Sequence, residues 1–265
     1  MRISRRFEEL QAANQAALVC FVTAGDPEPG VLPDLISAIA SGGADAIEVG
    51  IPFSDPLADG PSIQASSQRA LAAGMNSRLA MAEIAEARRR LPDLPIVVMT
   101  YFNPVLRFGM EAWAAAAASA GVDGHIVTDL SPEESAEWRA VSARHGLDTI
   151  FLVAPTSTDE RAAIVAELCT GFVYGVSRTG VTGARQKLSD EVGPMVARMR
   201  RFTQLPVCVG FGVSSADQAG QVAAMADGVV VGSALVDLIH QRRDDAGRDE
   251  AVSAFVRELK SGCIR

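Results

Sequence analysis

A glutamate near the end of a strand-like run is the first side chain of this sequence that could do acid/base chemistry. Side chains alternate along a strand, so Ile47, Val49 and Ile51 share one face of the run and Glu48 occupies the other. The β-branched set is suited to packing against helices, which directs Glu48 to the opposite side. A partly desolvated carboxyl group has a raised pKa, which a general acid working near neutral pH requires. The alternative is a rim glutamate that forms a salt bridge.

The loop after this run carries two more carboxylates, Asp55 and Asp59. Asp-Pro and Asp-Gly sequences also form ordinary turns, so each aspartate taken alone is explained as a turn residue. One loop nevertheless brings an acid, a small flexible tip and a second acid back over the same strand end. The pattern therefore predicts carboxylate chemistry at this strand end, with Glu48 as one member of the set.

Glycine-rich turns late in the chain indicate a site for an anion such as phosphate. Gly210-Phe211-Gly212 follows one strand-like run, and Gly232-Ser233 follows the next run and opens a helix. Glycines let backbone N–H groups approach a ligand, and a helix N-terminus adds a favourable dipole. Such a site needs no lysine or arginine. The alternative, glycines that serve only tight turns, explains either turn singly better than both together.

A third glycine-rich segment has the composition of a hinged lid. Gly180 and Gly183 bracket a short β-branched tip that includes Thr182, and such a loop can close over a ligand and exclude water. The alternative is a surface loop that its glycines make flexible. Tyr174, on the strand-like run before it, is either a core aromatic or a polar-tipped wall of a pocket, and the sequence leaves both open.

These side chains must be positioned by an alternation of short apolar runs and longer segments with helical periodicity. Leu32, Leu35, Ile36 and Ile39, for example, fall on one helical stripe. The eight strand-like runs are Ala17 to Thr23, Ala44 to Val49, Pro95 to Tyr101, Gly124 to Thr128, Thr149 to Val153, Gly171 to Val176, Pro206 to Val209 and Gly228 to Val231.

Eight strand–helix units predict an α/β fold with one closed (β/α)8 barrel domain over residues 1–265, because such a barrel needs about 250 residues. Active sites of these barrels lie at the carboxyl ends of the strands, where all the side chains above would meet. We expect an extra N-terminal helix with Ile3, Phe7 and Leu10 to plug the barrel floor, and an extra C-terminal helix after the polar stretch 241–249. An open doubly wound sheet is the alternative, but 209–213 lacks the third glycine of a dinucleotide fingerprint.

The composition limits the classes of partner and the kinds of chemistry that we expect for this protein. The chain has 32 Asp plus Glu against 24 Lys plus Arg, and only 5% aromatic residues, which argues against nucleic acid or an anionic membrane as main partner. The histidines and cysteines show no metal-binding spacing, so we expect no metal. Scattered cysteines, no signal peptide and no membrane-spanning stretch predict a cytoplasmic protein.

With these residues in place, the chain resembles the alpha subunit of tryptophan synthase over essentially its whole length. Of the segments that carry the resemblance, the one from Glu48 to Pro61 is highly specific. The glycine pairs are shared with many phosphate-binding barrels. The segments are Phe21-Val-Thr-Ala-Gly-Asp-Pro27, Glu48-Val-Gly-Ile-Pro-Phe-Ser-Asp-Pro-Leu-Ala-Asp-Gly-Pro61, Ser177-Arg-Thr-Gly-Val-Thr-Gly183, Gly210-Phe-Gly212 and Gly232-Ser-Ala234.

The resemblance implies a lyase that cleaves indole-3-glycerol phosphate to indole and glyceraldehyde 3-phosphate by a retro-aldol route. Glu48 would protonate C3 of the indole and then help to remove the proton of the glycerol hydroxyl. Asp59 would accept a hydrogen bond from the indole N–H and stabilise the developing positive charge. The other implied ligand contacts are Phe21, Ile63, Tyr101, Tyr174 and Phe211 around the substrate, Gly183, Gly212, Gly232 and Ser233 at the phosphate, and Thr182 closing onto Asp59.

The resemblance also implies a partner, the pyridoxal-phosphate-dependent beta subunit, which receives indole in an αββα assembly. The loop 53–60 and the segment 101–105 would face it, and this chain itself would hold no cofactor. Two departures from the family pattern stand out: Ser131 replaces a proline expected after Asp129-Leu130, and 186–192 is idiosyncratic. The alternatives are a stand-alone lyase that releases free indole, and a regulatory phosphate-binding barrel, which would not require the Glu48 and Asp59 pair.

Overall fold

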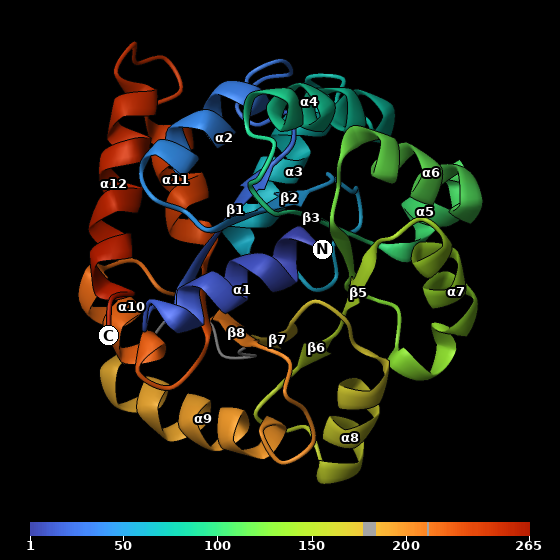
Figure 1. Ribbon diagram of the computed structural model, residues 1–265. Helices are drawn as coiled ribbons and strands as arrows, with labels where there is room; N and C mark the ends of the chain where they lie inside the picture. Colours follow the sequence, from blue (N-terminus) through green and yellow to red (C-terminus); the bar gives the residue numbers. More distant parts are fainter. Residues whose placement is uncertain (177–183, 211) are drawn as a thin grey trace.

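The computed structural model describes residues 1–176, 184–210 and 212–265, without the side chains of 184–190, and shows a (β/α)8 barrel with additional helices (Figure 1). The described strands are β1 (Ala17–Thr23), β2 (Ala46–Gly50), β3 (Ile96–Thr100), β4 (Gly124–Val127), β5 (Asp148–Ile150), β6 (Leu152–Val153), β7 (Val173–Val176), β8 (Val207–Gly210) and β9 (Gly228–Val231). The described helices are α1 (Arg2–Ala12), α2 (Leu32–Ser41), α3 (Pro61–Ala72), α4 (Ser77–Arg90), α5 (Phe102–Phe108), α6 (Met110–Ala120), α7 (Ala136–Arg144), α8 (Asp159–Leu168), α9 (Ala184–Met199), α10 (Ala216–Ala223), α11 (Ser233–Gln241) and α12 (Arg248–Gly262), with a 3₁₀ turn at Pro132–Glu134.

The strands pair in parallel in the order β5-β4-β3-β2-β1-β9-β8-β7-β6. The two end strands of this order, β5 and β6, are halves of one barrel strand interrupted at Phe151, so the sheet closes on itself. The backbone N–H of Tyr174 donates to the carbonyl of Phe151 at 3.0 Å, which maintains contact across the interruption. The predicted eight-unit barrel is confirmed. The fifth strand, which the sequence pattern predicted as unbroken, is interrupted.

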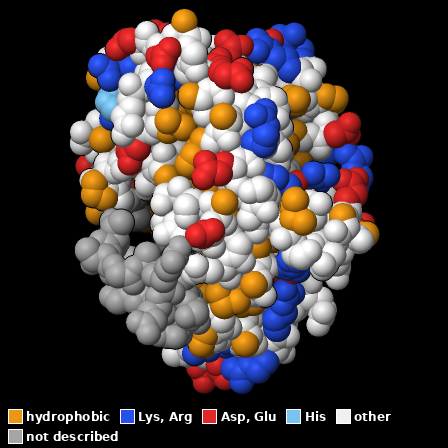
Figure 2. All heavy atoms as spheres, turned by 90° about the vertical axis from the view of Figure 1, so that its left-hand side faces the viewer, with side chains coloured by type: hydrophobic (Ala, Val, Ile, Leu, Met, Phe, Trp, Pro, Cys, Tyr) orange, Lys and Arg blue, Asp and Glu red, His pale blue; other side chains and the backbone are white. Residues whose placement is uncertain are grey.

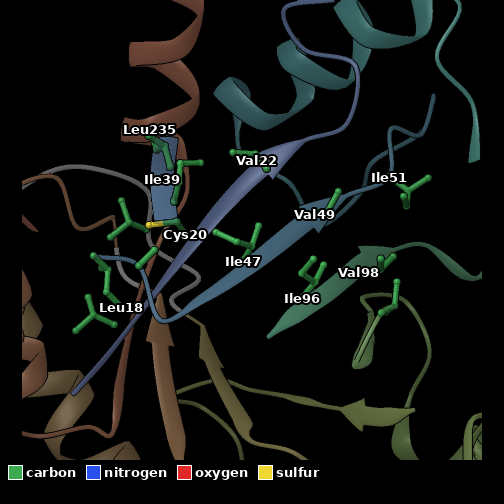
Figure 3. Close-up of a cluster of buried hydrophobic side chains, with 14 of the residues drawn as sticks. Leu18, Cys20, Val22, Ile39, Ile47, Val49, Ile51, Ile96, Val98 and Leu235 are labelled. Atoms are coloured by element: carbon green, nitrogen blue, oxygen red, sulfur yellow. The ribbon is translucent and has the colours of Figure 1, made fainter. Parts of the chain in front are cut away.

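The apolar core has an outer layer between strands and helices and an inner layer within the barrel. Ile47, Val49 and Ile51 belong to the outer layer, as Figure 3 shows for β2 among its neighbours. Ala46, on the other face of β2, belongs to the inner layer. The predicted parity of β2 is therefore confirmed, and it places Glu48 on the inward-facing side.

Helix α1 closes the floor of the barrel, as predicted. It crosses in front of the strands in Figure 1, and Ile3, Phe7 and Leu10 are buried in the inner layer. The ring of Phe7 lies 5.9 Å from that of Phe172. The apolar stripe of α1 thus extends the inner core to the amino ends of the strands. The predicted C-terminal helix is α12, which packs against α2 and α10.

Aspartates that precede three of the strands fix the floor by a repeated contact. Asp45 accepts a hydrogen bond from Leu18 N at 2.7 Å and Asp123 from Ile96 N at 2.9 Å, and Asp227 accepts one from Val207 N at 2.8 Å. Each carboxylate therefore ties the start of its own strand to the start of a neighbouring strand. The sequence pattern does not mark these three residues, because aspartate before a strand is common in turns.

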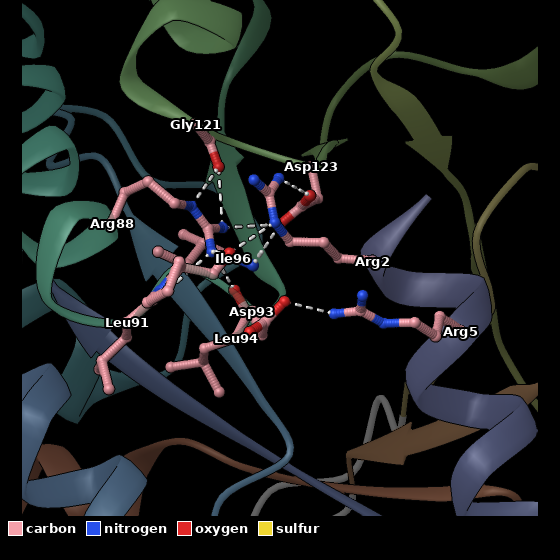
Figure 4. A network of polar contacts seen from close by, with 10 residues as sticks. Arg2, Arg5, Arg88, Leu91, Asp93, Leu94, Ile96, Gly121 and Asp123 are labelled. Atoms are coloured by element: carbon pink, nitrogen blue, oxygen red, sulfur yellow. Dashed lines mark hydrogen bonds and ion pairs between the residues drawn. The ribbon is translucent and has the colours of Figure 1, made fainter.

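Removal of the Asp123 carboxylate should be strongly destabilising. Asp123 is nearly buried and bonds Arg88 at 2.8 Å and Arg2 at 2.9 Å (Figure 4). Asp123→Ala leaves the half-buried Arg88 guanidinium without its carboxylate, and we expect the free energy of unfolding in urea to fall by about 3–5 kcal/mol. Asp93→Ala is the matched control, since its ion pair with Arg5 is exposed and should matter little. Equal losses in both variants would contradict this account.

The molecular surface mixes side chains of opposite charge. On the face that Figure 2 shows, Lys and Arg side chains lie interspersed with Asp and Glu and with small apolar groups. Near the connection between α11 and α12, Arg242 pairs with Asp245 at 2.7 Å and Arg243 with Asp244 at 3.3 Å. Across the described ranges, no helix combines the length and apolar character needed to cross a membrane.

Candidate functional site

Glu48 is a buried carboxyl group inside the barrel, with a relative exposure of 1%. Its Oε2 atom is enclosed and has no hydrogen-bond partner among the described residues. Burial, and secondarily the charge of Asp59, raise the pKa of Glu48 to about 8. The carboxyl group therefore carries its proton at neutral pH. The rim position considered as an alternative is excluded by this burial.

Phe21 lies beside Glu48 because β1 and β2 pair in that register. A Cβ atom at Gly50 would lie 2.5 Å from Cζ of Phe21, closer than real contacts allow. The glycine at position 50 therefore makes room for the aromatic ring next to the buried acid. The sequence analysis did not assign Gly50 this role, although a glycine within a strand often marks such a close approach.

Asp59 reaches the same region from the loop after β2. It is half-buried, and burial raises its pKa, whereas a hydrogen bond with the Tyr101 side chain acts to lower it. Its charge is the second cause, after burial, of the raised pKa of Glu48. Asp55 is exposed and bonds the hydroxyl of Ser54 at 2.5 Å, so it does not join the pair.

Tyr174 stands on β7 at the edge of the inner core, half-buried. Burial, followed by the charge of Glu48, holds the pKa of its hydroxyl well above its usual range. A Cβ atom at Gly210 would lie 3.0 Å from the Tyr174 hydroxyl, so Gly210 leaves space for this group. The ring therefore packs against the core, which is one of the two options that the sequence left open, and the charge of Glu48 acts on the hydroxyl.

The start of α11 lies next to the aromatic part of the site. A Cβ atom at Gly232 would lie 3.6 Å from Cβ of Phe21 and 3.7 Å from Cδ1 of Ile63. Elements β1, α3 and α11 therefore meet here. Gly232 precedes the helix and Ser233 is exposed in its first turn, where backbone N–H groups lack partners within the helix. Gly212, after the neighbouring strand β8, has a φ of 65°, which favours glycine.

Two polar contacts fix the helix that follows Asp59, and the sequence analysis missed both. The hydroxyls of Thr23 and Ser66 lie 2.6 Å apart, which joins β1 to α3. Arg69 of α3 donates to both carboxylate oxygens of Asp26, at 2.7 and 2.9 Å. The only sequence signal was the segment Phe21 to Pro27, which contains one member of each pair.

Three of the predicted contacts, Thr182, Gly183 and Phe211, lie outside the described residues. Among the residues that are described, no group of three or more His, Cys, Asp or Glu side chains is placed to hold a metal ion. What the described part brings together is a protonated carboxyl group, a second carboxylate, aromatic and aliphatic walls, and a helix N-terminus. This set is suited to proton transfer onto an aromatic ligand that carries an anionic group.

Comparisons with known proteins match the chain to one family over nearly its whole length. Residues 7–263 match the family described as tryptophan synthase alpha chain. The tryptophan synthase alpha chain of Geobacter sulfurreducens is 51% identical over 259 residues, 98% of this chain and 97% of the relative. That of Solibacter usitatus is 48% identical over 261 residues, with the same two coverages.

Solved structures show the same likeness. A chain of Mycobacterium tuberculosis tryptophan synthase superposes with a TM-score of 0.90 at 41% identity, covering 100% of this chain and 98% of that chain. Tryptophan synthase subunit alpha from Legionella pneumophila superposes with a TM-score of 0.90 at 33% identity, covering 99% and 98%. The protein belongs to the tryptophan synthase alpha chain family, whose members are lyases.

Proposed function

We propose that this barrel cleaves indole-3-glycerol phosphate to indole and glyceraldehyde 3-phosphate, with Glu48 and Asp59 as the catalytic pair. The observation that carries the proposal is the buried Glu48, whose pKa of about 8 keeps it protonated next to Asp59. Cleavage of the C–C bond is difficult until C3 of the indole is protonated. A neutral carboxylic acid inside an apolar barrel is the group that this step requires.

The proposed steps balance in protons and electrons. Glu48 gives its proton to C3, and the indole ring becomes an indolenine-like cation. Asp59 accepts a hydrogen bond from the ring N–H and stabilises that positive charge. The C3–glycerol bond then breaks, its electron pair returns to the ring, and the neighbouring glycerol hydroxyl loses its proton to Glu48 as the aldehyde forms. The general acid is thereby regenerated.

The remaining site residues are assigned to binding. Phe21, Ile63, Tyr101 and Tyr174 would line the indole ring, together with Phe211. The backbone N–H groups at Gly232 and Ser233 would hold the phosphate, since a helix N-terminus favours an anion. Gly183 and Gly212 are the further phosphate ligands that we propose, and Thr182 would close onto Asp59. The negative net charge of the chain does not oppose this substrate, because its phosphate is bound by backbone groups.

Alpha chains of this family hold no cofactor of their own, and pyridoxal phosphate belongs to the beta subunit. We propose that this chain passes indole to such a beta subunit in an αββα assembly in the cytoplasm. Exposed apolar side chains support a partner at the barrel mouth: Leu57 is 91% exposed and Leu106 on α5 is 50% exposed. These two positions lie on or beside the loop 53–60 and the segment 101–105.

The proposed function is tested by incubating the purified chain with indole-3-glycerol phosphate and measuring indole and glyceraldehyde 3-phosphate as they form. The assay is repeated with added beta subunit. We expect stoichiometric formation of both products and a higher rate with the partner. No cleavage in either condition would refute the proposed reaction. If the chain reaches full turnover without the beta subunit and its rate does not change when the beta subunit is added, the dependence on the partner is refuted. The proposed reaction would then still stand.

Ser233→Asp separates phosphate binding from fold stability. An aspartate in the first turn is favourable for a helix, but its charge would repel the phosphate. We expect the free energy of unfolding to stay equal or rise, while KM for the phosphorylated substrate rises about tenfold or more, a cost of about 1.4 kcal/mol. Ser233→Ala, which adds no charge, is the control and should bind nearly as well as the native chain. An unchanged KM in Ser233→Asp would remove α11 from the phosphate site.

A further inference from the structure

The Tyr101 side chain holds the loop that carries Asp59. Its hydroxyl oxygen accepts a hydrogen bond from the backbone N–H of Ala58 at 3.0 Å. Its ring lies 5.1 Å from the ring of Phe53, with an angle of 31° between the planes. Asp59 is the next residue after Ala58, and the Tyr101 and Asp59 side chains each act on the pKa of the other. One side chain therefore contacts the beginning and the end of the loop 53–60.

Tyr101 is itself fixed by the neighbouring strand ends. It directly follows β3, is 3% exposed and precedes the first residue of α5. The next backbone N–H, of Phe102, donates to Oδ1 of Asp129 at 2.7 Å, and Asp129 lies in the loop after β4. The phenol is thus anchored by β3 and β4 while it contacts the loop after β2.

Counting donors gives the direction of the hydrogen bond to Asp59. The phenol has one proton, and the Ala58 N–H already occupies an acceptor position of its oxygen. An ionised carboxylate can only accept, so in a hydrogen bond between these two side chains the phenol is the donor and Asp59 the acceptor. Burial, with the charge of Asp59 as the second cause, raises the pKa of Tyr101 to about 12, so this proton is retained at neutral pH.

We propose that Tyr101 is the positioning residue of Asp59: its hydroxyl group orients one carboxylate oxygen and keeps the group ionised, which leaves the other oxygen for the indole N–H. The inference rests on the proposed function and adds to it a role distinct from lining the substrate. Burial alone works against an ionised Asp59, and the donated hydrogen bond works for it. The loop contacts then hold this carboxylate in place before substrate arrives.

The test is Tyr101→Phe, which keeps the ring and its contact with Phe53 but removes the donated proton. We expect kcat to fall about 10- to 100-fold, the range for the loss of a hydrogen bond to a charged group. The midpoint at which activity is lost on the acidic side of the kcat/KM profile should move to higher pH. KM should change less than kcat, because the apolar wall remains.

A second measurement does not depend on activity. The carboxyl carbon of Asp59 is followed by NMR in protein with ¹³C-labelled aspartate, and its signal is identified by its loss in Asp59→Asn. The midpoint of its titration should be higher in Tyr101→Phe than in the native chain. Other titratable groups whose charges act here are Glu48 on β2 and Tyr174 on β7. Both side chains are retained in the variant, so a shift reports the lost donor.

Two controls separate positioning from packing. Phe53→Leu disturbs the ring contact but keeps the hydroxyl, and it should leave the Asp59 midpoint in place. In an Asp59→Asn background, Tyr101→Phe should cause little further loss of kcat. An unchanged Asp59 midpoint, or an equal loss of kcat in both backgrounds, would overturn the inference and leave the proposed function intact. Absence of cleavage by the native chain would refute the proposed function, while the titration would still decide whether Tyr101 controls Asp59.

Discussion

Glu48→Gln should lower the turnover of indole-3-glycerol phosphate by about 100- to 10,000-fold, the contribution of a positioned general acid. Glutamine has nearly the same shape and fits the same buried space, but it cannot give up a proton to C3. Binding should remain, since the walls and the phosphate end are untouched. The measurements are single-turnover cleavage, and calorimetric titration with a non-cleavable analogue that lacks the glycerol hydroxyls. Activity close to that of the native chain would refute the role of Glu48.

The same residue gives activity a defined dependence on pH. A general acid must be protonated, so kcat/KM of the native chain should fall as pH rises through about 8, the pKa of Glu48. On the acidic side it should fall as Asp59 takes up a proton. A rate that keeps rising well above pH 8 would contradict the assignment of Glu48 as the acid.

Glu48→Gln should lower activity but raise stability at alkaline pH. In the unfolded chain Glu48 ionises near its ordinary pKa of 4.5, whereas in the fold it stays protonated up to about 8. The contribution of this group to stability is therefore present below pH 4.5 and is lost as pH rises to about 8. Glu48→Gln does not titrate, so above pH 8 it should unfold with a free energy greater than that of the native chain by on the order of 3–5 kcal/mol. The gain should vanish near pH 4, which urea titrations at the two pH values would show.

Asp59→Asn should reduce kcat by about 100- to 1000-fold, because a neutral amide cannot stabilise the cation that forms on the ring. It should also move the alkaline limit of the pH profile to lower pH, since the charge of Asp59 contributes to the raised pKa of Glu48. A lower kcat without that movement would mean that the charge of Asp59 does not contribute to the pKa of Glu48. The combined result would therefore measure their coupling as well as the role of Asp59.

Asp55→Asn is the matched control for this experiment, measured on the isolated chain. It makes the same chemical change in the same loop, but at an exposed position whose carboxylate bonds Ser54. Turnover should stay close to that of the native chain. A loss as large as that of Asp59→Asn would mean that the loop needs its net charge rather than one particular carboxylate.

Periodicity was sufficient to predict which way Glu48 points. The alternation of Ile47, Val49 and Ile51 is a local property, and burial of a β-branched face decides the orientation of a whole strand. Helical periodicity likewise gave the floor helix, and the glycines themselves marked the strand ends. These are features that a few consecutive residues determine.

Features that depend on contacts between distant segments were not predicted. The break at Phe151 lies in a run whose composition is that of an ordinary strand. The room for Tyr174 comes from Gly210 on another strand, and the side chain that acts on Asp59 comes from Tyr101, directly after β3. No spacing within one segment reports such pairs. The Asp26 and Arg69 contact was hidden for the same reason, since it joins two separate βα units.

The closed floor has a consequence for traffic through the barrel. Because Ile3, Phe7 and Leu10 fill the amino end of the described barrel, we expect substrate, products and exchangeable protons to pass over the carboxyl ends of the strands. Glu48 lies at depth and the glycine turns lie at the rim, so a ligand that satisfies both enters ring first and stays tethered by its phosphate. We therefore expect both halves of a cleaved ligand to leave over the carboxyl ends of the strands, and the order of their departure to be set there.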